Sequence, residues 1–480
     1  MLWMSLLLPH LPIEARPAGT ADPAAVTDGA GAHRRLIACN EPALRAGISA
    51  GMDVPSALMR VPMLRLLPRS QADERRALHA LAGWAQQFTA TVSVDLLRWT
   101  LWLEIGASLG YFGGLDALRS AIDAGLAQLG YTARTGIAPT PEAAALLAAH
   151  PEVPAVLTLK ALRARLSPLA LTHLAVDART LKALQASGIR TCGELLQLPP
   201  PALARRFGAA LPQYLRRLLG EESDPRPRHT VPEAYRRRCG LPEPVDALEA
   251  LLFPLRRLLL ELEGWLRGRD AALQRLTVTL AHRSMPDTQL ELITSSPQRE
   301  AVRLFALLRE KLERTMLHEP VSELRIAATE LVAPQALQGD FFDDRARRQH
   351  DWSALLDKLR ARLGSEAVRR LGLRDDHRPE HAWCIRTEDD RPPANEGGSN
   401  EGGSYPDRPD SPDRPLWLLE PTPIARLPKL FGAPERIEAG WWAGEDTSRD
   451  YYVARTPEGA RWWIYRDGRT GKWFLQGLWA

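Results

Sequence analysis

The stretch from residue 386 to residue 414 is rich in Pro, Gly, Ser and Asp and contains the run EGGSNEGGS. Such a composition offers few apolar side chains for burial and is typical of a flexible, unpaired linker. The chain is therefore expected to fold as separate parts on the two sides of this stretch. Its length of 480 residues is also too great for one hydrophobic core and suggests several domains.

Charge is distributed unevenly along the chain. Residues 375–450 hold nine Lys/Arg and seventeen Asp/Glu, whereas residues 205–238 hold nine arginines and only four acids. A basic cluster of this kind suits contact with nucleic-acid phosphates, although a solvated helix face explains the charge alone equally well. The four cysteines lie far apart, with no CxxC pair and no His at ligand spacing, which argues against a zinc site and a disulfide framework.

The first fifteen residues, MLWMSLLLPHLPIEA, are strongly apolar. A signal peptide would carry a basic residue ahead of an unbroken apolar core, but no Lys or Arg precedes Arg16, and Pro9 and Pro12 interrupt the run. No stretch approaches the roughly 18 apolar residues of a spanning helix. We therefore expect a soluble cytoplasmic protein whose first strand is apolar and buried.

Apolar periodicity predicts mixed α and β structure over the first 160 residues. The expected strands are 2–8, 35–39, 92–94, 100–105 and 131–137, and the expected helices are 70–87, 114–129 and 140–149. Short helices should follow up to about residue 225, and then two helices against an antiparallel sheet. Beyond residue 415, alternating aromatic residues separated by PEG and DGRTG turns predict a small β-rich module.

The segment LKALQASGIRTCGELLQLPPPALARRFG predicts two helices joined by a tight turn at Gly188. In a helix-hairpin-helix of this kind, the amides at the start of the second helix can face a nucleic-acid phosphate. A plain corner between two helices is the alternative. The residues expected to contact DNA are Gly188, Ile189, Arg190, Thr191, Arg205 and Arg206.

Several segments, taken in order, resemble the Y-family translesion DNA polymerases. They are ACNEPALRAGISAGM in the fingers, EIGASLGYFGG and ARTGIAPTPEAAALLA in the palm, and the thumb-like SGIRTCGELLQLPPPALARRFG. PLWLL and the ending GWW…RDYYVAR…WFLQGLWA resemble the ImuB group, polymerase-like proteins of bacterial mutagenesis cassettes. The ordered series, rather than any single motif, carries the resemblance.

The resemblance implies a multidomain α+β fold, the Y-family right hand with a small β-rich C-terminal module. The implied parts are the palm at 1–18 and 70–160, the fingers at 19–69, the helical thumb at 161–238, the little finger at 239–335, a loop and helix at 336–385, the flexible linker at 386–414, and an aromatic partner-docking module at 415–480.

Active members of the family hold two magnesium ions with carboxylates from D-x-D-x-F-F…E and S-x-D-E runs. When Glu14 is aligned with the closing Glu, the two aspartate positions are Ser5 and Leu7. When LEIG is aligned with the L-D-V-T run that follows the second motif, the Asp-Glu pair falls on Trp99 and Thr100. The resemblance therefore implies no catalytic residues, no metal and no cofactor.

The fingers of active members also carry a Y-x-x-R run that grips the incoming triphosphate. Its two positions fall on Glu41 and Leu44, and Arg45 lies one place away. The alternative is an active, distributive lesion-bypass DNA polymerase that holds magnesium through other ligands. Asp95 and Glu104 are the nearby carboxylates that such an enzyme would use.

The run Gln338-Gly339-Asp340-Phe341-Phe342 resembles the Q-x-[S/D]-L-F peptides with which bacterial proteins bind the sliding clamp. Two adjacent aromatic rings can fill an apolar pocket while Gln338 and Asp340 make hydrogen bonds at its rim. The alternative is a loop whose phenylalanines cap the little finger. A second, weaker candidate is the run from Leu427 to Phe431, which lacks the Gln.

The resemblance to the ImuB group implies a non-catalytic adaptor in DNA-damage tolerance and SOS mutagenesis. Such an adaptor would link an error-prone replicative-type DNA polymerase and a RecA-like accessory protein of the ImuA type to the sliding clamp, and would bind DNA weakly. The partner contacts are expected on the tryptophans of the C-terminal module: Trp441, Trp442, Trp462, Trp463 and Trp473.

Overall fold

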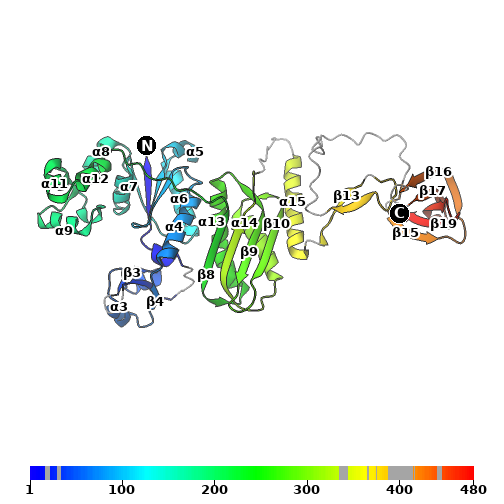
Figure 1. Ribbon diagram of the computed structural model, residues 1–480, viewed down its shortest axis with the longest axis horizontal. Coiled ribbons are helices and arrows are strands. Elements are labelled where there is room, and N and C mark those ends of the chain that lie inside the picture. Colours follow the sequence, from blue (N-terminus) through cyan, green and yellow to red (C-terminus); the bar gives the residue numbers. More distant parts are fainter. Residues whose placement is uncertain are drawn as a thin grey trace. The chain divides into compact units, whose positions relative to one another are not determined.

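The computed structural model describes residues 1–16, 22–29, 34–334, 344–364, 367–374, 376–386, 414–415, 417–440 and 446–479. The chain divides into two compact units, residues 1–362 and 363–480 (Figure 1). Both contain β-sheets, and the first also contains most of the described helices. The multidomain α+β class and the β-rich C-terminal module are thus as predicted. No helix among the described residues is both long and apolar enough to cross a membrane.

The palm is a four-stranded antiparallel sheet built around the first strand. Its order is β5 (Val92–Asp95), β6 (Thr100–Glu104), β1 (Trp3–Leu7) and β7 (Arg134–Ala138). On one face, Met4 and Leu6 of β1 join the core formed by helices α4 (Gln71–Ala85) and α6 (Leu115–Gln128). On the other face, Trp3 packs with helix α7 (Pro141–Ala148) and the thumb. The first strand is apolar because both of its faces are buried.

The fingers form a small subdomain inserted after the short helix α1 (Leu11–Glu14). Strands β3 (Arg35–Cys39), β2 (Ala24–Asp28) and β4 (Arg65–Pro68) make its sheet, in that order. Helices α2 (Glu41–Arg45) and α3 (Val54–Arg60) pack beside the sheet, and Asn40 and Asp53 cap their N-termini through side-chain hydrogen bonds.

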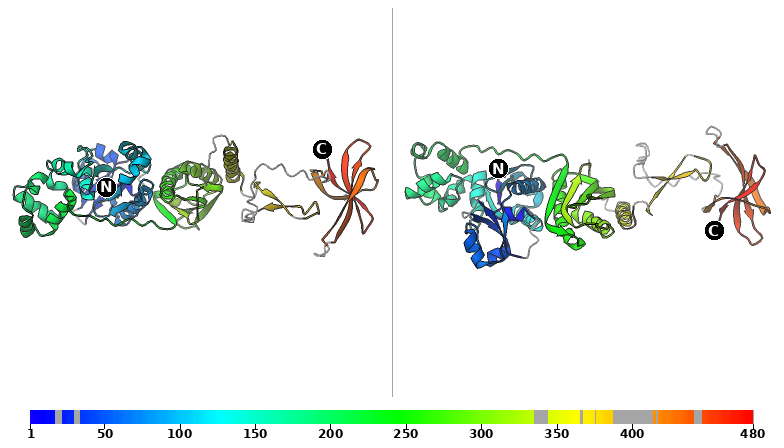
Figure 2. Two further views of the ribbon diagram at one scale, coloured as in Figure 1. Left: turned by 90° about the horizontal axis from the view of Figure 1, so that it is seen from above. Right: turned by 60° about the horizontal axis from the view of Figure 1, so that its bottom comes forward.

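The thumb consists of short helices that share a core with α7. They are α8 (Leu159–Leu166), α9 (Ala178–Ala186), α10 (Cys192–Leu196), α11 (Pro200–Phe207) and α12 (Ala210–Leu219). Residues 221–234 then lead from the thumb to the little finger along the palm, as the green segment in Figure 2 shows. The amide of His229 in this segment donates to the carbonyl of Val92, 2.7 Å away.

The little finger packs two helices on one face of an antiparallel sheet. The sheet order is β10 (Thr288–Gln298), β9 (Ala272–Ala281), β11 (Val321–Ala328) and β8 (Tyr235–Val245), and the short β12 (Leu331–Val332) pairs with β9. Helices α13 (Leu248–Arg267) and α14 (Ala301–Glu313) cover its core face. Helix α15 (Asp344–Leu363) docks beside this sheet, where the Asp357 carboxylate accepts hydrogen bonds from the amide and the hydroxyl of Ser295.

The C-terminal unit contains a hairpin and a curled sheet. The hairpin pairs β13 (Arg370–Leu373) with β14 (Trp383–Arg386). The five-stranded sheet has the order β15 (Trp417–Pro423), β19 (Trp473–Leu478), β18 (Arg461–Asp467), β17 (Thr447–Arg455) and β16 (Lys429–Ala439). Its core contains Tyr451, Trp463 and Tyr465.

Candidate functional site

The palm sheet brings three of the four predicted metal-site positions to one face. Ser5 pairs with Trp102 and Leu7 pairs with Thr100 across β1 and β6. Because alternate residues of a strand share a face, these four side chains project from the same side of the sheet. The fourth position, Trp99, lies in the turn between β5 and β6. Its backbone carbonyl accepts a hydrogen bond from the amide of Leu8, 3.0 Å away.

None of the four residues offers a carboxylate. Ser5 is fully buried, and its hydroxyl has no hydrogen-bond partner among the described residues. The Thr100 hydroxyl donates to the carbonyl of Arg98, 3.0 Å away. Trp99 adopts a φ of +49°, and its indole turns toward the helical side of the palm, where it donates to Glu74 at 2.9 Å. These side chains cannot replace the carboxylate ligands with which active members of the family hold magnesium.

The carboxylates of the enzymatic alternative lie at opposite ends of β6. Asp95 pairs with Thr100, so it lies four residues from Glu104, or about 13 Å along the strand. Asp95 accepts hydrogen bonds from the amides of Leu97 and Arg98 and thereby forms the turn. Glu104 accepts hydrogen bonds from the amides of Leu2 and Gly106. These two carboxylates therefore cannot bind the same ion.

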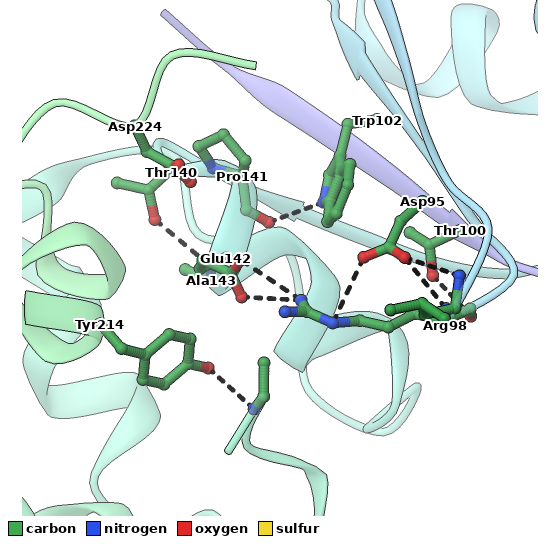
Figure 3. Close-up of polar contacts among 12 residues, drawn as sticks. Asp95, Arg98, Thr100, Trp102, Thr140, Pro141, Glu142, Ala143, Tyr214 and Asp224 are labelled. Carbon is green, nitrogen blue, oxygen red and sulfur yellow. Dashed lines mark hydrogen bonds and ion pairs between the residues drawn. The ribbon is translucent and has the colours of Figure 1, made fainter. Parts of the chain in front are cut away.

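A different set of charges occupies this face of the palm, and we call it the palm ion network: Asp95, Arg98, Glu142, Asp224 and Arg226. Figure 3 shows Arg98 between Asp95 and Glu142. Its Nη1 lies 3.0 Å from one oxygen of Glu142, and its Nε lies 3.4 Å from Asp95. Arg226, in the segment after the thumb, forms ion pairs with both Glu142 and Asp224. Of these residues only Asp95 was predicted as a site residue, because the ion pairs of Glu142 join it to Arg98 and Arg226, which lie 44 and 84 positions away in the sequence.

The palm ion network is largely shielded from solvent. The side chains of Glu142 and Arg226 are only 5% and 15% exposed. The Arg226 guanidinium lies over the ring of Trp102, 4.2 Å from its centroid, and the Trp102 indole donates to the carbonyl of Pro141 at 3.0 Å. Burial alone would lower the pKa of Arg226, but its hydrogen bonds to Glu142 and Asp224 raise it above its ordinary value. Arg226 therefore stays charged at every physiological pH.

Two guanidinium groups thus neutralise most of the charge of three carboxylates beside Thr100 and Trp102, on the face of the palm that carries the predicted metal-site positions. A divalent ion there would have to displace Arg98 and Arg226 from Glu142. Over the described ranges, no group of three or more His, Cys, Asp or Glu could hold a metal ion.

The fingers place Glu41 and Arg45 on helix α2, where they form an exposed ion pair one helical turn apart. The Leu44 side chain between them is also exposed. A triphosphate gripped by Arg45 would therefore compete with Glu41 for the same guanidinium.

The thumb hairpin has the predicted turn, with Gly188 at a φ of +83°. Its amides, however, already have acceptors. Glu194 accepts from the amides of Arg190 and Thr191, and the amides of Cys192 and Gly193 donate to carbonyls of residues 169 and 167. These hydrogen bonds lower the pKa of Glu194. A DNA phosphate would therefore meet side chains at this hairpin, and Arg190, Arg205 and Arg206 are all exposed.

The C-terminal sheet separates the predicted partner-binding tryptophans. Trp463 is only 3% exposed and stacks on Tyr451 with ring centroids 4.3 Å apart, so the expectation that it forms a docking surface is wrong. It belongs to the core together with Tyr465, which lies two residues further along β18 and therefore on the same face of the sheet. Trp462 and Trp473 are partly exposed, whereas Trp441 and Trp442 lie outside the described residues.

The predicted clamp motif, Gln338 to Phe342, also lies outside the described residues. The weaker candidate is partly in strand β16, where residues 429–431 pair with residues 453–455 of β17. Leu427 and Phe431 are 46% and 41% exposed. The side chains of Leu427 and Phe431 are therefore accessible to solvent. The last three residues of the candidate are paired within the sheet, so they are not free to extend into another protein.

Comparison with known proteins agrees with this architecture. The model of the impB/mucB/samB family matches residues 13–149, which begin after strand β1. The protein ImuB of Caulobacter vibrioides is 27% identical over 467 residues, which cover 90% of this chain and 99% of ImuB. This chain is therefore a homologue of ImuB that carries a domain similar to the impB/mucB/samB family. This homology associates it with translesion synthesis in DNA-damage tolerance.

Proteins named as DNA polymerases are among its relatives as well. DNA polymerase IV of Yersinia pseudotuberculosis is 29% identical over 241 residues, which cover 48% of this chain and 67% of the polymerase. Among solved structures, the Y-family chimera of Dbh and Dpo4 is 13% identical and covers 69% of this chain and all of its own, with a TM-score of 0.38. DinB of Sulfolobus solfataricus is 14% identical over 70% of this chain, with a TM-score of 0.37.

Proposed function

We propose that this chain is a non-catalytic adaptor in mutagenic translesion synthesis. The single observation that carries the proposal is the palm ion network, in which Arg98 and Arg226 hold Glu142 on the face of the palm that carries the predicted metal-site positions. In-line phosphoryl transfer needs metal ions that neutralise both the attacking and the leaving oxygen. Carboxylates that are already engaged with guanidinium groups are not available to coordinate a metal ion. The chain would then keep the polymerase fold without catalysing the reaction.

The adaptor would link several partners on one chain. We place the sliding clamp at Gln338, Asp340, Phe341 and Phe342. We place an error-prone replicative-type polymerase and a RecA-like accessory protein on the C-terminal module, where Trp462 and Trp473 are the two predicted contact residues that are both described and partly exposed. Weak contacts on one chain reinforce each other because each raises the effective concentration of the next partner. The stretch at 386–414 would supply the reach between them.

DNA contact in this proposal is modest, and the charges of the little finger support this. On the sheet face opposite α13 and α14, Arg325 forms ion pairs with Glu323 and Asp287, and Arg275 forms ion pairs with Glu291 and Glu330. A phosphate backbone would meet a face whose arginines are already neutralised. Sequence-independent DNA contact would then rest on Arg190, Arg205 and Arg206 of the thumb.

Primer extension tests the absence of catalysis. We expect the purified full chain to incorporate no nucleotide on an undamaged or a damaged template, with either magnesium or manganese. DNA polymerase IV of Yersinia pseudotuberculosis serves as the positive control. Template-dependent incorporation that disappears in Asp95→Ala or Glu104→Ala would overturn the proposal and favour the active lesion-bypass polymerase, because no contaminating enzyme would respond to those changes.

Retention on immobilised sliding clamp tests the adaptor role. We expect the Gln338→Ala/Phe341→Ala/Phe342→Ala variant to bind the clamp about 100-fold more weakly than the unchanged chain, because it loses both aromatic anchors and the rim hydrogen bond. The matched control is Leu427→Ala/Phe431→Ala, which we expect to retain clamp binding. Full retention by the triple variant would remove the assignment at 338–342, and loss of binding only in the control would move it to 427–431.

A further inference from the structure

A cavity of about 500 Å³ lies where the palm, the fingers and the little finger meet within the first unit. We call it the junction cavity. The palm contributes residues of α1 and α4, the fingers contribute residues of β2 and β4, and the little finger contributes β8, α13 and Glu323 of β11. Its volume falls in the range of about 300–1,000 Å³ typical of small-molecule sites. It is separate from the palm ion network, since the two share no residue.

Arginines dominate the wall of the junction cavity. Six of the lining residues are arginines and only three are acids: Arg16, Arg65, Arg76, Arg237, Arg238 and Arg257 against Asp73, Glu261 and Glu323. This excess of positive charge within a partly enclosed space favours an anionic ligand, because the protein walls exclude much of the screening solvent.

The three carboxylates already have partners. Asp73 forms ion pairs with Arg16 and Arg76. Glu261 is buried, and it forms an ion pair with Arg237 and accepts a hydrogen bond from the Tyr235 hydroxyl at 3.0 Å. Glu323 pairs with Arg325, which does not line the cavity. Each of the three carboxylates is therefore already paired with at least one arginine. The positive charge of the other arginines that line the cavity is left without a carboxylate partner among the described residues.

Three arginines supply that remaining charge. Within the described part of the chain, neither Arg65 of the fingers nor Arg238 of the little finger has an ion-pair partner. Arg257 donates to the backbone carbonyl of Glu14 at 2.9 Å and lies over the ring of Tyr131, 4.5 Å from its centroid. The charged group of Arg257 thus contacts a backbone carbonyl and an aromatic ring, and it makes no hydrogen bond to a carboxylate of the described residues.

We propose that the junction cavity binds a phosphate-bearing ligand of nucleotide size. The planar guanidinium forks of Arg65 and Arg238 match phosphate oxygens, and Arg257 adds a third positive charge. Apolar residues of the wall, such as Ile13, Leu67 and Leu241, suit the less polar remainder of a nucleotide. Two sources share this chemistry, a free nucleotide and the backbone of a nucleic-acid strand.

Such a ligand would join the fingers to the little finger. Arg65 comes from the fingers, Arg238 from edge strand β8 of the little finger, and Arg257 from helix α13. Binding that requires all three in place stabilises their present arrangement, because the free energy of binding is available only to that arrangement. This inference does not depend on the adaptor proposal, since it concerns neither catalysis nor the clamp.

Calorimetric titration of the full chain at low salt tests the site, with tripolyphosphate, a deoxynucleoside triphosphate and a five-nucleotide single strand as probes. We expect tripolyphosphate to bind and to raise the melting temperature. Arg65→Gln and Arg238→Gln should each weaken binding by about tenfold, because each removes a charge-assisted hydrogen-bond donor. The matched control is Arg309→Gln, which removes an exposed arginine that pairs with Glu313 on α14, away from the cavity.

The probes also distinguish the two sources. Tighter binding of the triphosphate than of the short strand identifies a free nucleotide, and the reverse order identifies a nucleic-acid backbone. The Arg65→Gln/Arg238→Gln variant completes a double-mutant cycle. If its loss of binding free energy differs from the sum of the losses in the two single variants, one ligand contacts both residues. Failure of all three probes to bind, or equal binding by the double variant and the unchanged chain, overturns the proposal.

Discussion

Replacing Glu142 by alanine should lower the free energy of unfolding of the first unit by about 3–5 kcal/mol. Glu142 is the carboxylate that Arg98 and Arg226 share, and its side chain is 5% exposed. Removing it leaves two guanidinium groups without their common partner, one of them in a largely buried position above Trp102. The loss should appear as a lower urea midpoint with little change in the slope of the transition.

The matched control is Glu152→Ala. Glu152 also forms an ion pair, with His150 at 3.0 Å, but its side chain is 67% exposed. Exposed pairs of this kind contribute about 0–1 kcal/mol, so the control should unfold almost as the unchanged chain does. A loss below about 1 kcal/mol for Glu142→Ala would contradict the view that the palm ion network holds the segment after the thumb against the palm.

Replacing Trp463 by alanine should destabilise the C-terminal sheet by about 3–5 kcal/mol, since truncation of a buried tryptophan leaves a large cavity. Trp463 is 3% exposed and stacks on Tyr451, whose hydroxyl donates to Gln476 at 2.6 Å. Hydrogen exchange read by mass spectrometry should show faster exchange of the amides in β17, β18 and β19 of the full chain.

Trp462→Ala is the control for this prediction. Trp462 is the neighbouring residue of the same strand, but its side chain is partly exposed on the other face of the sheet. We expect its replacement to leave amide protection close to that of the unchanged chain. If Trp463→Ala retained full protection and instead lost a protein partner, the assignment of Trp463 to the core would be wrong.

Much of the palm could be predicted from local sequence. The expected helices 70–87, 114–129 and 140–149 correspond to α4, α6 and α7, and the expected strands 2–8, 92–94 and 100–105 correspond to β1, β5 and β6. Strands β2 and β4 of the fingers were missed. They are short, and their pairing is set by contacts between residues about forty positions apart, such as Val26 with Leu67.

The candidate site could be predicted only in part. Ser5, Leu7 and Thr100 lie together on the palm because strand pairing follows from the apolar pattern of neighbouring strands. The palm ion network could not be found this way. Glu142 follows a strand, Arg226 follows the thumb, and nothing in their local sequence indicates that Glu142 meets both Arg98 and Arg226.

The sequence by itself determined which residue types are available on this chain. In the alignment that the resemblance implies, Ser5, Leu7, Trp99 and Thr100 stand where active members have carboxylates, and no arrangement of the backbone can turn these residues into carboxylates. The tertiary structure decided what fills their place and which aromatic residues face inward. Ion pairs between distant segments, the inward position of Trp463 and the arginine-lined junction cavity all depend on how separate elements pack, and local propensity carries no information about that packing.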